Sequence, residues 1–208
     1  MPVSKRRAPK VRLSRVAIER REQILRGACD VITREGFAKA TVRQIADAAG
    51  MPVPTMYQYV RSKEEILAMI YQRFLEEINQ RLAASLQPGG SPRQKVVALI
   101  RATAETFDHY HAYVKLLFRE TKSLGPKARQ QVFDLDLACI ATWTSTLESA
   151  AAGGLKIRNP ELVANLIYYL CTVWAIRHWA IGKYGFERVL EGIADLVLGG
   201  LGDEQLDR

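Results

Sequence analysis

The sequence predicts an all-helical protein of about nine helices. Apolar residues recur every three or four positions nearly throughout the chain, while period-two alternation and Asn-Gly or Asp-Gly hairpin turns are missing. Clusters of glycine and proline separate segments of helical length. The expected helices cover residues 16–35, 42–49, 54–60, 63–86, 93–109, 112–122, 127–152, 159–181 and 186–198.

Charge divides the 208 residues into two parts. Residues 1–63 contain fourteen Lys and Arg against five Asp and Glu, whereas residues 64–208 contain sixteen against seventeen. A basic first third favours a polyanionic partner such as DNA, since Lys and Arg neutralise phosphates. We therefore expect a basic flexible arm at residues 1–15, a DNA-binding domain at residues 16–62, and a larger neutral domain at residues 63–208.

Two short helices follow the first long one within the expected DNA-binding domain. Gly36 is placed to end the first helix. Thr41 and Gln44 have the spacing of a capping box, which predicts a helix start at residue 42. Gly50 and Pro52 stop that helix. Two short helices around a tight glycine turn form a helix-turn-helix, whose second helix enters the major groove of DNA.

The second short helix has a polar, uncharged outer face. On a helical wheel Met56 and Val60 point inward. Gln58 suits an adenine edge, and Arg43 on the preceding helix is placed to reach guanine or a phosphate. The outward residues of this second helix are Pro54, Thr55, Tyr57 and Gln58, with Tyr59 at the flank.

The stretch TVRQIADAAGMPVPTMYQYVRSKEEIL, residues 41–67, resembles the DNA-binding motif of the tetracycline-repressor-like (TetR/AcrR) family. The resemblance implies an all-helical homodimer with an N-terminal three-helix DNA-binding domain and a C-terminal domain for dimerisation and ligand binding. Carried over by position, it implies phosphate contacts by Thr41 and Lys63. It implies DNA contacts by Arg43, Thr55, Tyr57, Gln58 and Tyr59. Pro52 and Val53 depart from the family pattern, which commonly has a serine cap and a polar residue there.

The basic arm is expected to follow the DNA backbone or a minor groove through Lys5, Arg6, Arg7, Lys10 and Arg12. The helix at residues 159–181 carries more apolar surface than one neighbouring helix can cover. The resemblance implies that it forms a dimer interface with the last helix. The interface residues expected on it are Leu162, Leu166, Leu170 and Val173.

The resemblance also puts a ligand cavity among the C-terminal helices, and pockets in helical bundles often lie between helices. The expected lining residues are Phe107, His111, Phe118, Phe133, Trp143, Thr144, Trp174 and Arg177. Such a lining favours a largely apolar effector. Arg177 can pair with an anion, which favours a fatty acyl compound, either free or carried on coenzyme A. The alternative ligand class is an aromatic molecule.

No nucleophile–base constellation, glycine-rich phosphate loop or metal-ligand motif is present in the sequence. We therefore expect no enzyme activity, no cofactor and no metal. Neither a signal peptide nor a membrane span is apparent, which predicts a cytoplasmic protein. The leading hypothesis is a ligand-released repressor that binds a palindromic operator as a homodimer. Two alternatives are an effector-independent DNA-binding dimer with a solid core and, more remotely, an enzyme that carries a helix-turn-helix.

Overall fold

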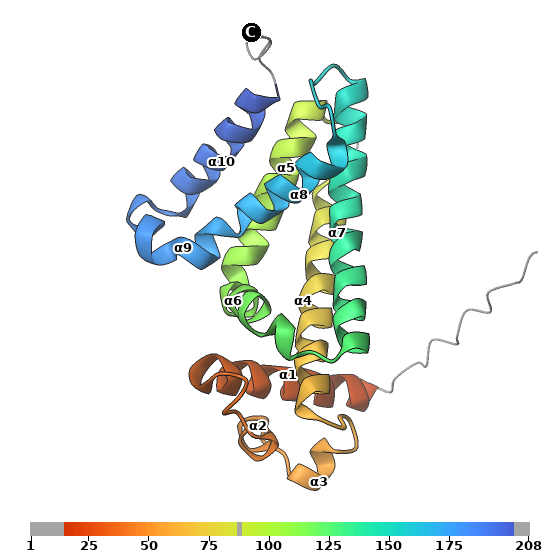
Figure 1. Cartoon of the computed structure of the whole chain (residues 1–208), viewed down its shortest axis with the longest axis vertical. Coiled ribbons are helices and arrows are strands. Elements are labelled where there is room, and N and C mark those ends of the chain that lie inside the picture. The colour runs from red at the N-terminus through yellow and green to blue at the C-terminus, as the bar shows by residue number, and fades with distance from the viewer. Residues whose placement is uncertain (1–14, 87–88, 202–208) are drawn as a thin grey trace, which may run out of the picture. The chain divides into compact units, whose positions relative to one another are not determined.

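The computed structural model describes residues 15–86 and 89–201, and every regular element in these ranges is helical (Figure 1). The predicted arm lies outside the described residues except for Arg15, the first residue of α1. The all-helical fold class is confirmed. The helices are α1 (Arg15–Glu35), α2 (Val42–Ala48), α3 (Val53–Met56), α4 (Lys63–Ser85), α5 (Pro92–His109), α6 (His111–Glu120), α7 (Pro126–Ala152), α8 (Pro160–Cys171), α9 (Val173–Ile181) and α10 (Phe186–Gly200).

The chain forms two compact units, which divide after Ile66 within α4. The first contains α1, α2 and α3, with α2 packed against both of the others. Its core contains the apolar stripe of α1, Ile45 and Ala46 of α2, and Met56 of α3, and the residues from the two short helices are fully buried. Gly36, with a φ of 82°, ends α1 in the left-handed conformation that favours glycine.

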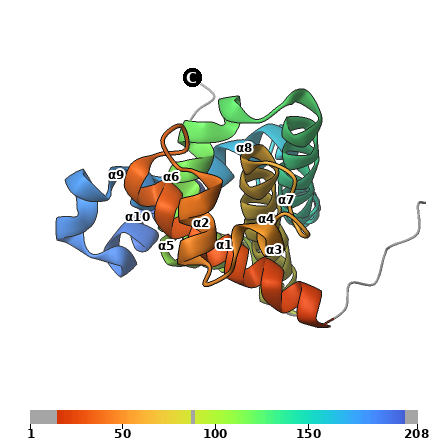
Figure 2. The same cartoon turned by 90° about the horizontal axis from the view of Figure 1, so that it is seen from below.

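The second unit is a bundle in which α7 packs against α5 and α8, while α5 also contacts α10 (Figure 1). Figure 2 looks nearly along α4 and α7. These two helices are joined by a hydrogen bond of 2.9 Å from the Asn79 amide to the Cys139 sulfur. On the other side of the bundle, α6 packs against α9. Helices α4, α5, α6, α7 and α8 supply the walls of a cavity in this unit.

The predicted helix at residues 159–181 is two helices, so the described residues contain ten α-helices rather than about nine. The break falls at Thr172, whose amide and hydroxyl both donate to the carbonyl of Tyr169, at 3.0 and 2.6 Å. A threonine that bonds its own preceding turn competes with the regular helical ladder. The apolar periodicity continues across the break, which is why the sequence pattern did not reveal it.

Candidate functional site

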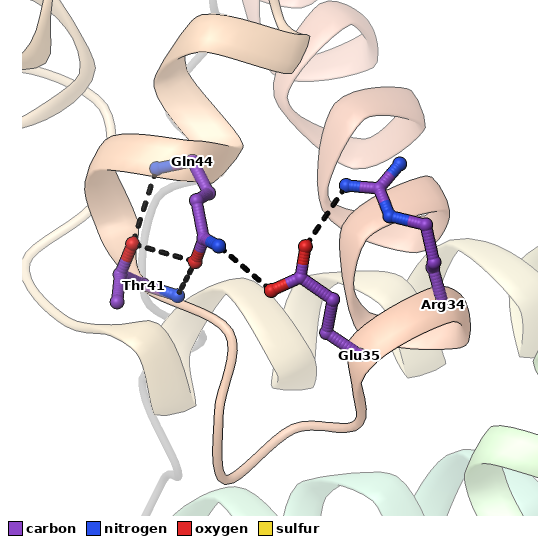
Figure 3. Close-up of polar contacts among 4 residues, drawn as sticks. All are labelled: Arg34, Glu35, Thr41 and Gln44. Atoms are coloured by element: carbon purple, nitrogen blue, oxygen red, sulfur yellow. Dashed lines mark hydrogen bonds and ion pairs between the residues drawn. The ribbon is translucent and has the colours of Figure 1, made fainter.

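The start of α2 is fixed by a polar network that extends beyond its capping box (Figure 3). The Thr41 hydroxyl accepts from the backbone N–H of Gln44 at 3.2 Å and donates to the Gln44 side-chain oxygen at 2.7 Å. The Gln44 amide nitrogen then donates to Glu35 at 2.7 Å, and Arg34 pairs with the other Glu35 oxygen at 3.0 Å. The cap of α2 is thereby tied to the end of α1, which fixes the angle between the two helices.

The second short helix, α3, presents the polar face that the sequence predicts. Met56 and Val60 are buried, whereas Tyr57 and Gln58 are exposed. The regular helix ends at Met56, but hydrogen bonds to the carbonyls of Val53, Thr55 and Met56 continue the turns through residue 60. Pro54 is also exposed, while Thr55 and Tyr59 are half-buried. The predicted reading residues therefore lie on or beside one accessible surface.

Pro52 stands at the N-cap of α3 without a side-chain hydrogen bond, and Val53 is half-buried. The proline ring sets a φ of −63°, and Pro54 follows in the first turn, where its missing N–H costs no helical bond. Two prolines thus replace the hydroxyl cap in defining where α3 begins.

The Lys63 ammonium forms hydrogen bonds to backbone carbonyls of the first unit. It donates to the carbonyls of Phe37, Ala38 and Ala40 at 2.7, 3.2 and 3.0 Å, and it lies 4.5 Å from the centre of the Phe37 ring. A lysine has three donors. In this conformation none remains for a DNA phosphate, and the hydroxyl proton of Thr41 is likewise donated to Gln44. By contrast, Arg43 is exposed.

Gly27 of α1 is a contributor to the site that the sequence analysis missed. A Cβ atom built there would lie 2.7 Å from the backbone nitrogen of Ala49 and 2.9 Å from the carbonyl carbon of Ala48. The end of α2 thus packs directly on the α1 backbone, an approach that only glycine permits. An isolated glycine inside a helical pattern is the sequence signal that would have indicated it.

The second unit contains an apolar cavity of about 240 Å³ between α4, α5, α6, α7 and α8. Phe118 and Tyr169 meet edge to face at 5.9 Å and are both more than half exposed, so they form the rim. Deeper in the cavity, the ring of Phe107 lies 5.3 Å from that of Tyr168. The main apolar lining residues are Phe74, Phe107, Val114, Leu117, Phe118 and Ile140.

One carboxyl side chain, that of Asp136 of α7, lies in the wall of this cavity. Burial raises the pKa of its carboxyl group, and a hydrogen bond from the Tyr168 hydroxyl acts in the opposite direction. Tyr168 also contacts Cys139, and burial raises the pKa of the Cys139 thiol to about 12. Asp136 is not among the ligand residues predicted from the sequence, although it occupies the helical row between Val132 and Ile140, both buried.

The predicted ligand residues divide among several locations. Phe107 and Phe118 line the cavity, whereas His111 and Trp174 line a smaller pocket of about 170 Å³ between α5, α6 and α9. In that pocket the Trp174 indole donates to Asp108 at 2.6 Å. Phe133, Trp143, Thr144 and Arg177 line neither of these two pockets.

Each of those four residues has a different environment. Phe133 is exposed and Trp143 is fully buried. The Thr144 hydroxyl donates back to the carbonyl of Ile140 at 2.9 Å. The Arg177 guanidinium is exposed and lies 5.2 Å from the centre of the Trp179 ring. An anionic ligand in the cavity would therefore lack the cation that the sequence analysis assigned to it.

The α8 face predicted to dimerise exposes large apolar side chains. Leu162 and Leu166 are exposed by 54% and 62%, and Tyr169 by 63%. Leu170 and Val173 are half-buried. Leu196 of α10 is 71% exposed. These helices thus leave uncovered the kind of surface that a second subunit would bury.

A helix-turn-helix with a polar reading face, joined to a helical unit with an apolar cavity, is typical of ligand-responsive DNA-binding regulators. Residues 24–70 match the family described as bacterial regulatory proteins, tetR family, and residues 89–201 match the tetracyclin repressor-like C-terminal domain. The chain belongs to the TetR family. Regulators of this family bind operators, dimerise and bind small-molecule effectors.

Curated relatives and solved structures agree with this assignment. The chain is 28% identical to the HTH-type transcriptional repressor KstR2 of Mycolicibacterium smegmatis over 194 residues, covering 91% of this chain and 94% of the relative. The structure of the ketosteroid transcriptional regulator KstR2 of Mycobacterium tuberculosis aligns with a TM-score of 0.72 at 24% identity, covering 89% and 96% of the two chains. AibR in complex with isovaleryl coenzyme A and operator DNA aligns at 0.73 and 18%, covering 86% and 98%.

These matches support a DNA-binding transcriptional repressor, the function predicted from the sequence. No helix among the described residues is long and apolar enough to cross a membrane.

Proposed function

We propose that the protein is a cytoplasmic, homodimeric repressor that binds a palindromic operator and leaves it when a small, largely apolar ligand fills the cavity of the second unit. The observation that carries the proposal is the cavity itself, about 240 Å³ within the same chain as a helix-turn-helix. The alternative of an effector-independent dimer with a solid core requires this space to be filled. For ligand binding to release DNA, the ligand must bind the operator-bound dimer less tightly by the same factor.

Base reading is assigned to the exposed face of α3 and to Arg43. Gln58 is exposed on that face and has the amide geometry that pairs with adenine. Tyr57 and Tyr59 carry hydroxyls that suit phosphates, while Thr55 and Pro54 offer apolar contact to a thymine methyl. Lys63 and Thr41 act differently from the implied phosphate contacts, because their donors hold the first unit together.

The ligand class is supported by the cavity lining and by the relatives. Aromatic and aliphatic side chains favour an apolar ligand, and the described relatives include a ketosteroid regulator and a complex with isovaleryl coenzyme A. The exposed leucines of α8 and Leu196 of α10 support dimerisation through those two helices.

Selection of duplexes from a random library by the full chain tests the DNA half of the proposal. A two-fold dimer should enrich a palindrome whose half-site centres lie about 34 to 36 Å apart, or a multiple of that distance. Gln58→Ala should relax the preference at one position of each half-site and cost about 1 to 3 kcal/mol at fixed salt. The control is Gln131→Ala, an exposed glutamine of α7 in the second unit. An asymmetric selected site, or an unchanged base preference in Gln58→Ala, would contradict the assignment.

Dimerisation is tested separately with Leu166→Glu. A charge at this exposed α8 position should prevent the burial of the apolar face and yield monomers that have lost most operator affinity. Sedimentation velocity measures the oligomeric state. Phe133→Glu, at an exposed apolar side chain of α7, is the control for added charge. A Leu166→Glu protein that remains dimeric would remove α8 from the interface.

A further inference from the structure

The polar groups that line the cavity differ in whether they already form hydrogen bonds within the protein. The Asn165 amide donates to the carbonyl of Glu161 at 2.9 Å, and the Thr172 hydroxyl donates to the carbonyl of Tyr169 at 2.6 Å. The Tyr168 hydroxyl lies against both Asp136 and Cys139. The Asp136 carboxyl therefore has the largest remaining hydrogen-bonding capacity, since an ionised carboxylate offers about four acceptor sites and a single hydroxyl occupies one.

No basic side chain balances this carboxyl group within residues 15–86 and 89–201. The groups that act on Asp136 are its buried surroundings and the Tyr168 hydroxyl, and no ion pair joins it to Lys or Arg. The nearby Cys139 thiol is held in its neutral form by burial. A partly buried carboxylate without a counter-ion is costly unless a partner supplies the opposite charge.

The aromatic side chains that line the cavity beside Asp136 limit the size and shape of the ligand. The same cavity presents the rings of Phe74 and Phe107, whose centres are 5.9 Å apart, and a rim of Phe118 and Tyr169. A cavity of about 150 Å³ accommodates benzene. A volume of about 240 Å³ therefore has room for one ring with a short chain.

We propose that the effector is a compact apolar molecule whose polar end is a cationic amine, and that Asp136 is the counter-ion that recognises it. The inference rests on the proposed function and names the ligand class of that same cavity. An ammonium head supplies the charge and the donors that the carboxyl lacks, and the apolar side chains around the partly buried Asp136 strengthen the attraction by lowering the local dielectric constant. A carboxylate head would instead meet a like charge. The assignment therefore disfavours the fatty acyl class at this position, since Arg177 is not in the cavity lining.

Three probes that share one skeleton test the head group: 4-phenylbutylamine, 4-phenylbutan-1-ol and 4-phenylbutyrate. Calorimetric titration of the full chain near pH 7.5 should give an amine affinity about tenfold or more above that of the carboxylate, with the alcohol between them. Asp136→Asn keeps the shape of the side chain and removes its charge, so the amine should lose about tenfold while the carboxylate improves. Asp134→Asn, which alters an exposed carboxylate two residues away on α7, should leave the order unchanged.

The outcomes separate this inference from the proposed function. Equal affinity for the three heads, tighter binding of the carboxylate, or no binding of the amine overturns the amine assignment, and the wild-type comparison decides this even if Asp136→Asn fails to fold. The proposed function is tested on the selected operator duplex. If an amine that saturates the cavity leaves operator affinity unchanged, release by ligand is wrong while Asp136 recognition stands. If the alcohol alone releases the operator, the repressor mechanism stands and the amine assignment fails.

Discussion

The two units of the molecule differ in how they treat buried polar groups. In the first unit the ammonium of Lys63 satisfies three backbone carbonyls, and Gln44 connects the cap of α2 to α1. Among the described residues, the buried side-chain atoms without a hydrogen-bond partner are all in the second unit: Thr103 Oγ1, Arg129 Nε and Trp143 Nε1. The same unit contains the cavity and the helix break at Thr172.

This difference fits the DNA-binding role of the first unit and the proposed ligand-binding role of the second. A base-reading surface requires a fixed geometry, because a displacement of α3 would move every contact with the groove together. A unit that responds to a ligand requires two arrangements of similar free energy. Buried atoms without hydrogen bonds and unfilled space lower the stability of one arrangement. They thereby reduce the free-energy difference between the two arrangements. Four substitutions test this difference between the two units.

Gly27→Ala should have the largest effect, because the new methyl group would meet the backbone of Ala49 at 2.7 Å. Overpacking typically costs about 1 to 3 kcal/mol and occasionally more. Because the obstructing atoms here belong to the backbone, we expect a cost above about 3 kcal/mol, which exceeds the gain of about 1 kcal/mol in helix propensity. We expect a lower melting temperature for the first unit and about tenfold weaker operator binding, measured by circular dichroism and anisotropy. Gly90→Ala, where the nearest atoms lie 3.8 Å away, is the control. A stabilised Gly27→Ala protein would contradict the close packing of α1 and α2.

Lys63→Met should destabilise the first unit by about 2 kcal/mol, since three charge-assisted hydrogen bonds are lost and three carbonyls lose their donor. Urea unfolding measures the loss. Lys39→Met, at an exposed lysine of the same unit, should change stability little. The slope of log affinity against log salt distinguishes the two roles of Lys63. An unchanged slope would agree with the carbonyl contacts. A decrease of about 0.9 in the slope would instead indicate that Lys63 contacts a DNA phosphate, as the family resemblance implies.

Thr103→Val should stabilise the second unit by about 1 kcal/mol, because it replaces a fully buried, unpartnered hydroxyl with a methyl group of the same shape. The melting temperature should rise by about 2 to 4 °C. Thr146→Val is the matched control, since the buried Thr146 hydroxyl donates to the carbonyl of Thr142 at 3.0 Å. That substitution should bring no gain. Equal effects of the two would show that the hydroxyl of Thr103 is not a source of instability.

Asp136→Asn should have the smallest effect on the ligand-free protein and should depend on pH. The folded-state pKa of Asp136 is raised by burial, so between the unfolded and folded pKa values the folded chain retains a proton that the unfolded chain has released. This contribution is favourable below the unfolded pKa of about 3.9, and it is lost as pH rises through the folded value. The variant should therefore melt at a higher temperature than wild type at pH 7, with the difference shrinking toward pH 4. A constant difference across this range would mean that the charge of Asp136 is not its cause.

The features that depend on local spacing follow from the sequence alone. The spacing of three positions from Thr41 to Gln44 suffices for the capping box, and the helical period alone turns Met56 and Val60 inward. The residues of the reading face follow from the same period. Gly36 ends α1 where predicted, because a left-handed residue is a local requirement.

Contacts between groups that are distant in the sequence depend on how the helices pack. Lys63 reaches carbonyls 23 to 26 residues earlier in the chain, and Asp136 enters a cavity whose other walls come from four helices. Phe107 and Phe118 were predicted to line that cavity, but Trp143 and Arg177 also satisfied the apolar or charged pattern and lie elsewhere. Periodicity fixes the face of a helix on which a residue lies. Which neighbour covers that face depends on how the helices cross, and this is set by packing between residues far apart in the sequence.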